Sequence, residues 1–144
     1  MDTRVRRSDL RRLTPIREPR VLSEVPLRMW SPAEWERIQR GFRARDMDDR
    51  WHAFAEDDRL FLHRSWLGDG KYEVAFVETR GGHRISRVLV EGAEPRYPGG
   101  SDREVCLLLE VLISSILLGE RAEDQRGQLA DLRSAGRPPQ PGDN

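Results

Sequence analysis

Apolar residues recur at helical spacing in two parts of the chain. Trp35, Ile38 and Phe42 follow one another at intervals of three and four, which predicts a helix over residues 32–44 with one apolar face. The stretch Ser31-Pro32-Ala33-Glu34 forms a capping box with proline at the first helical position. Ser101 to Glu104 repeats the capping pattern, and Gly119 suits a helix end, so a second helix is expected over 102–118.

Between the two helices the pattern changes to the alternation that is typical of strands. Strands are expected over residues 51–56, 59–67, 71–78 and 84–91. Short polar turns rich in Asp or Gly connect them, which indicates consecutive antiparallel hairpins. The pattern therefore predicts an α+β fold: a helix, a four-stranded antiparallel meander, and a C-terminal helix packed on the sheet.

The second expected helix is apolar around most of its circumference. A single sheet covers only one side of such a helix, so the helix needs a second cover. Cover from within the chain, by helix 32–44 or by the N-terminal arm, is one explanation. The other explanation, on which our functional hypothesis rests, is a homodimer or a protein partner on helix 102–118. The interface would then contain four apolar side chains: Leu107, Val111, Ile113 and Leu117.

Charge and proline divide the chain into three parts. Residues 1–29 contain eight arginines, four acidic residues and three prolines without apolar periodicity, and they are expected to form a flexible basic arm. Residues 30–119 are expected to form a single α+β domain. Residues 120–144 are expected to be a polar, mostly disordered tail, in which Leu129 and Leu132 would support a weaker helix over 120–133.

Composition excludes several classes of protein. No apolar stretch reaches the ~20 residues that cross a bilayer, and residues 1–29 have no apolar segment that would predict a secretory signal, so none is expected. Cys106 is the only cysteine, which excludes an intrachain disulfide. We therefore expect a cytoplasmic protein with no membrane association and no cofactor. Of the 25 basic residues, 24 are arginine, which is typical of a high-GC bacterial genome.

Arg64 is the most informative candidate for ligand binding. It falls on the same strand face as Leu60, Leu62 and Trp66, where a guanidinium must snorkel, stack on an indole or pair with a carboxylate. An arginine that fixes the sheet against a helix is one interpretation. The functional interpretation is an Arg–Trp platform for an anionic or planar small ligand. Its candidate residues are Arg64, Trp66, Trp51 and His63.

Metal binding and nucleophilic catalysis have weaker support. His52 and His63 are symmetric about the turn at Asp57-Asp58 and should lie opposite each other, but a zinc site needs a third ligand. The carboxylates of Asp46, Asp48 and Asp49 could hold a divalent ion, although an acidic connector that pairs with arginine explains them better. Cys106 is expected to be a buried, inert thiol. No metal ligand and no catalytic residue is therefore assigned.

One stretch of the chain resembles a known pattern. Residues 46–51 (DMDDRW), His63 to Gly68 (HRSWLG) and Tyr72 are similar to a motif of small, uncharacterised bacterial proteins, in which MDDRW is followed by FHRSWTG and IY. The resemblance covers about residues 42–80 and implies no activity. Leu67 stands where that pattern has threonine, and Gly70-Lys71 is an addition in the turn.

Three functional hypotheses follow. The first is a small non-enzymatic module that binds a ligand or self-associates through its last helix. The second is an enzyme acting on a phosphorylated or nucleotide-like ligand, in which Arg64, His63 and an acid from residues 46–49 converge in one cleft. The third is nucleic-acid binding through the arm. The excess of four positive charges on residues 1–29 is small for that role, and we do not expect nucleic acid as the partner.

Overall fold

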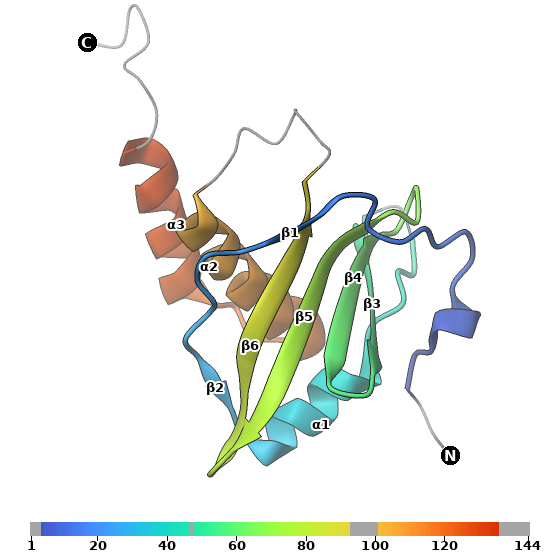
Figure 1. Cartoon of the computed structure of the whole chain (residues 1–144), viewed down its shortest axis with the longest axis horizontal. Helices are drawn as coiled ribbons and strands as arrows, with labels where there is room; N and C mark the ends of the chain where they lie inside the picture. Colours follow the sequence, from blue (N-terminus) through green and yellow to red (C-terminus); the bar gives the residue numbers. More distant parts are fainter. Residues whose placement is uncertain (1–3, 47, 93–100, 136–144) are drawn as a thin grey trace, which may run out of the picture.

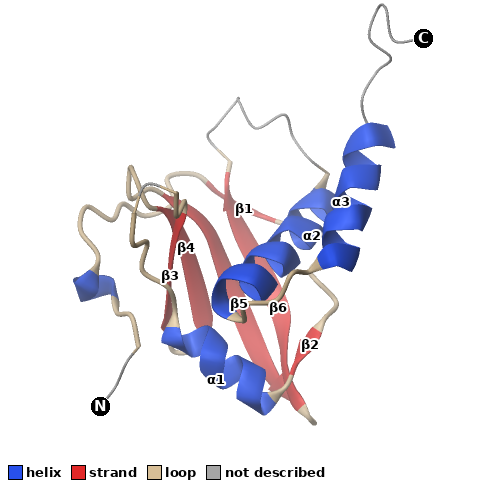
Figure 2. Ribbon diagram, turned by 180° about the vertical axis from the view of Figure 1, so that it is seen from behind, coloured by secondary structure: helices blue, strands red, loops and turns tan. Residues whose placement is uncertain are grey.

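A computed structural model describes residues 4–46, 48–92 and 101–135. One antiparallel sheet carries helices on one of its faces (Figures 1 and 2). Its meander consists of β3 (Trp51–Glu56), β4 (Arg59–Arg64), β5 (Gly70–Thr79) and β6 (Gly82–Glu91). The α+β class and the antiparallel hairpins are therefore confirmed.

The sheet is larger than the expected four strands. β1 (Pro19–Val21) and β2 (Met29–Trp30) both pair with β6, so the strand order is β1-β6-β5-β4-β3 with β2 also on β6. A meander leaves the far edge of its last strand unpaired, and the N-terminal segment supplies the missing backbone partners there. These strands of two and three residues are too short to show an alternating pattern. Parts of the segment that was expected to be a flexible arm are thus strands.

Two elements end earlier than their patterns predicted. α1 (Pro32–Arg40) ends at Gly41, whose φ of 72° leaves the helix, and Phe42 exchanges two backbone hydrogen bonds with Ala53 of β3. β4 ends at Arg64 because the backbone turns back: Gly68 N–H donates to the Arg64 carbonyl, and Arg64 N–H donates to the Asp69 carbonyl.

The two C-terminal helices pack against each other, and the first of them lies on the sheet. α2 (Asp102–Leu112) continues through a π-helical turn, Ile113–Leu117, and lies across the sheet. Its sheet-facing side joins the main core with Ile38, Leu60 and Val88. α3 (Glu123–Ala135) lies beside α2 (Figure 2) and buries Leu129. Much of the segment that was expected to be a disordered tail is therefore a helix, while residues 136–144 lie outside the described residues.

The four side chains of the expected interface are buried within one copy of the chain. Their exposed fractions are 7% for Leu107, 5% for Val111, 0% for Ile113 and 8% for Leu117. The premise that the fold cannot shield these four side chains is wrong, because Ile113 and Leu117 belong to the main core and α3 packs against α2. The burial of these side chains therefore removes the reason for expecting a homodimer or a protein partner on this helix. None of the described helices has the length and apolarity to cross a membrane.

Candidate functional site

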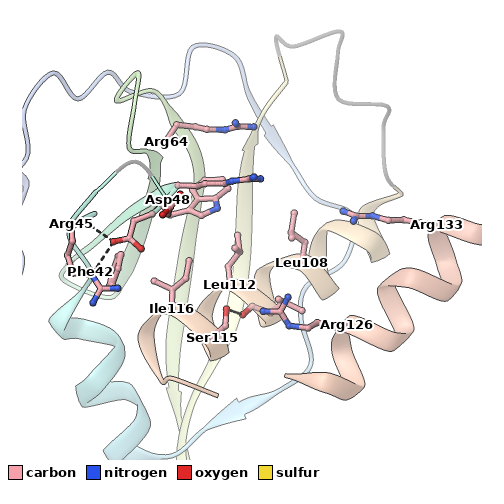
Figure 3. Close-up of a pocket in the computed structure, with 14 residues that line it drawn as sticks. Phe42, Arg45, Asp48, Arg64, Leu108, Leu112, Ser115, Ile116, Arg126 and Arg133 are labelled. Carbon is pink, nitrogen blue, oxygen red and sulfur yellow. Dashed lines mark hydrogen bonds and ion pairs between the residues drawn. The ribbon is translucent and has the colours of Figure 1, made fainter. Parts of the chain in front are cut away.

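A cleft of about 630 Å³ opens between the meander, the connector from α1 to β3, and the two C-terminal helices (Figure 3). Three segments that are distant in the sequence build it. Its lining divides into apolar and charged groups. The apolar residues are Phe42, Trp51, Leu108, Val111, Leu112 and Ile116, and the polar and charged ones are Arg45, Asp48, Asp49, Arg50, Arg64, Ser115, Arg126 and Arg133.

The sheet wall of the cleft comes from the paired ends of β3 and β4. Trp51 and Arg64 lie directly opposite each other in the register, so their side chains share the face that carries Leu62. The guanidinium carbon of Arg64 lies 5.7 Å from the centroid of the Trp51 ring. Among the described residues Arg64 forms no ion pair, and its buried Nε has no hydrogen-bond partner. Arg64 and Trp51 are therefore neighbours on this wall of the cleft.

The floor is a stripe of α2 and the π-helical turn. Leu108, Leu112 and Ile116 are four residues apart, which places them on one side of the helix. Leu108 and Ile116 are only half-buried, in contrast to most apolar residues of this helix. The hydroxyl of Ser115 donates a hydrogen bond of 2.6 Å to the Val111 carbonyl, which occupies its proton. The floor therefore presents mainly hydrocarbon to the cleft.

α3 supplies the opposite wall. Arg126 and Arg133 are seven residues apart, two helical turns, and both point toward the cleft in Figure 3. Arg126 donates from Nε to the Arg121 carbonyl, and neither arginine pairs with a carboxylate of the described chain. The side-chain hydrogen bonds and ion pairs of α3 within the described residues stay between residues 121 and 126. Apolar packing on α2, centred on Leu129, therefore holds this wall in place.

The connector from α1 to β3 carries the acidic groups of the cleft. The Asp49 carboxylate accepts hydrogen bonds from the Arg45 backbone at 2.9 Å and from its Nε at 3.1 Å. The guanidinium of Arg45 is the main reason that the pKa of Asp49 is lowered. Asp46 accepts a hydrogen bond from the Asp48 backbone. No metal-binding group of three His, Cys, Asp or Glu side chains occurs in the described part of the chain.

The lining of the cleft carries an excess of positive charge, although the whole chain has no net charge. Five arginines and two aspartates line it, whereas the complete sequence has 25 basic and 25 acidic residues. Of these five arginines, Arg45 alone forms an ion pair with an acidic residue of the described part of the chain. The cleft is therefore a local concentration of positive charge above an apolar floor.

His52 and His63 lie on the other face of the sheet. His52 and His63 are directly opposite each other in the register, as the hairpin symmetry predicted. His63 is buried, and its Nδ1 lies 2.9 Å from the Gly68 carbonyl, while Nδ1 of His52 accepts a hydrogen bond from the Ala44 backbone. Burial lowers the pKa of both imidazoles. His63 therefore does not reach the cleft that contains Arg64.

Trp66 also lies outside the cleft. Its side chain is 64% exposed and borders a separate shallow depression beside His52. β4 has already ended at Arg64, so the alternation that placed Trp66 on the Arg64 face does not extend to it. Of the four candidate ligand residues, the structure brings Trp51 and Arg64 together and places His63 and Trp66 elsewhere.

Sequence reasoning missed the arginines of the connector and of α3. Arg45, Arg50, Arg126 and Arg133 lie in polar segments, where charged side chains usually face water. The only local signal is that Arg126 and Arg133 are seven residues apart. That spacing is common among charged residues on the solvent-exposed face of a helix, so it does not indicate a cleft. Cys106 is buried as expected, and burial raises the pKa of its thiol to about 12.

Comparisons of the chain with protein-family models, with curated proteins and with solved structures gave no match. Any functional assignment therefore starts from the cleft itself.

Proposed function

We propose that this protein is a small, non-enzymatic binding module that holds an anionic small molecule in the cleft between the sheet and α3. The observation that carries the proposal is the placement of Arg64 on one wall and of Arg126 and Arg133 on the other (Figure 3). None of the three pairs with a carboxylate of the described residues, although the chain has as many acidic as basic residues.

Electrostatics supports an anion in this space. Guanidinium groups that face the same cleft repel one another, although solvent screens the exposed Arg126 and Arg133. An anion between the two walls would replace the repulsion with charge-assisted hydrogen bonds. The guanidinium fork matches the geometry of carboxylate and phosphate oxygens.

The arrangement favours binding over acid–base catalysis. The enzyme hypothesis required His63 to share a cleft with Arg64 and an acidic residue, and His63 lies on the opposite face of the sheet. Asp49 is a poor general base, because its hydrogen bonds with Arg45 lower its pKa. Arg64, Asp48 and Asp49 do share the cleft, and they suffice for binding. The cleft does not contain His63, the proton-transfer group of the enzyme hypothesis.

The N-terminal segment gives less support to nucleic-acid binding. Arg4 pairs with Glu36, Arg7 with Glu56, and Arg20 with Asp102. These ion pairs join the segment to the folded domain and occupy charges that would otherwise meet phosphates.

The test is isothermal titration calorimetry of the full chain at low ionic strength with inorganic phosphate, AMP and octanoate. At least one of the three anions should bind, and Arg64→Gln and the double variant Arg126→Gln/Arg133→Gln should each weaken it about tenfold or more, since one charge-assisted contact contributes about 1.5–3 kcal/mol. The control is Arg84→Gln, an exposed arginine of β6 outside the cleft. Absence of binding by all three anions, or equal losses in the Arg84 control, would refute the proposal.

A further inference from the structure

We infer that the ligand of this cleft is a small amphiphilic anion, with a hydrocarbon chain that ends in an acidic group, rather than a nucleotide. The inference rests on the proposed anion-binding function and names the chemical class of the ligand. It follows from the distribution of polar and apolar groups in the cleft.

The apolar groups of the cleft occupy its floor. Leu108, Leu112 and Ile116 form a row between the guanidinium of Arg64 and those of α3 (Figure 3). Leu108 and Ile116 keep part of their apolar surface open to the cleft, although α3 covers the neighbouring side of the same helix. Transfer of a hydrocarbon chain from water onto this row would bury apolar surface on both partners, which is favourable in proportion to the area removed from water.

The floor of the cleft has few hydrogen-bonding groups for a nucleobase. A base carries donors and acceptors along its edge, and burying them without partners is costly. The only polar side chain of the floor is Ser115, whose proton is already donated to the Val111 carbonyl. The floor is aliphatic, and the Trp51 ring is in contact range of Tyr72, with ring centroids 5.7 Å apart, and of the Arg64 guanidinium. A hydrocarbon chain needs no hydrogen bonds and fits these surroundings.

The charged groups surround this floor, and they determine where the acidic end of the ligand lies. Arg64 on the sheet and Arg133 on α3 are directed into the cleft from its two sides in Figure 3. When the acidic group of the ligand contacts either guanidinium, the hydrocarbon chain attached to it lies over Leu108, Leu112 and Ile116. Carboxylates and phosphate monoesters share this chemistry, and the two are separated by experiment.

The experiment is a chain-length series in titration calorimetry with butanoate, hexanoate and octanoate on the full-length protein. Each methylene that the floor buries should raise the affinity about fourfold. Octanoate should therefore bind at least tenfold more tightly than butanoate, AMP or inorganic phosphate. 1-Octanol, which has the chain without the charge, should bind at least tenfold more weakly than octanoate. Octyl phosphate in place of octanoate distinguishes the two kinds of acidic group.

A matched pair of variants locates the chain on the floor. Leu108→Gln should reduce the gain in affinity per methylene, whereas Leu67→Gln, at a loop residue that is 76% exposed, should leave that gain unchanged. Circular dichroism checks that both variants fold, and the chain-length series on the wild-type protein does not depend on them.

The possible outcomes separate this inference from the proposed function. Affinities that do not rise from butanoate to octanoate, or AMP binding as tightly as octanoate, would overturn the amphiphilic class while anion binding stands. Equal affinity for octanoate and 1-octanol would overturn the role of the arginines. If none of the anions binds, the proposed function itself fails.

Discussion

Leu129 is the side chain through which α3 is held against α2, and its replacement by alanine is expected to release this helix. It is 6% exposed, and no other side chain of α3 that the structure describes is buried. Hydrogen bonds and ion pairs do not connect α3 to the sheet or to α2 within the described residues. The variant Leu129→Ala therefore removes the main contact between α3 and the rest of the fold.

The size of the effect follows from the buried surface. Burying a leucine side chain contributes about 1.5–3 kcal/mol, and truncation to alanine removes most of this, about 2 kcal/mol. That loss lowers the docking equilibrium constant about 30-fold. A helix of 13 residues is marginal on its own in water, and Gly127 in its interior lowers its stability further. Once undocked, α3 should lose its helical hydrogen bonds.

Hydrogen exchange measured by mass spectrometry tests this prediction. In Leu129→Ala the amides of residues 123–135 should exchange much faster than in the wild-type protein, while those of β4, β5 and β6 keep their protection. Anion affinity should fall as well, because Arg126 and Arg133 leave the cleft and the binding-competent fraction decreases. Gln128→Ala changes an exposed residue of the same helix and is the control.

Two results would refute the reasoning. If residues 123–135 stay protected in Leu129→Ala, other contacts hold the helix. If α3 and the sheet lose protection together, α3 is part of one cooperative core and does not move as a separate wall of the cleft.

Three further predictions concern the stability of the fold. Gly41→Ala should destabilise the protein by more than about 1 kcal/mol in urea unfolding, because φ is 72° and the added Cβ would overlap the carbonyl oxygen of Ala53. Gly119→Ala meets no neighbour and should cost less, and equal costs for the two variants would contradict this. Glu34 accepts hydrogen bonds from Ser31 and Arg28, and these lower the pKa of its carboxyl group. The contribution of Glu34 to the free energy of unfolding is therefore present above the unfolded-state pKa of 4.5 and is lost as the pH falls through the lower folded-state pKa. Glu34→Gln should therefore flatten the acid side of the stability–pH curve, and an unchanged slope would argue against this role. Cys106, with a thiol pKa of about 12, should react with a disulfide reagent at pH 8 only after unfolding, and rapid labelling of the native protein would contradict its burial.

The capping and turn signals were reliable guides to local structure. The hydroxyls of Ser31 and Ser101 each accept a hydrogen bond from the third helical residue, as their sequence pattern predicted. β3 has the predicted bounds, and its turn into β4 places His52 opposite His63. Such features depend on a few neighbouring residues, so they can be recognised without knowledge of the rest of the fold.

The sequence determined the two main helices and the meander, because periodic apolar residues and capping groups act over a few positions. Tertiary structure decided the rest. β1 and β2 exist because β6 has an open edge, and α3 is held in place because α2 presents an apolar side. The cleft depends on the same packing, since its arginines come from the connector, from β4 and from α3. In the sequence an arginine that lines a cleft looks the same as one in water, because only the surfaces that meet on folding distinguish the two.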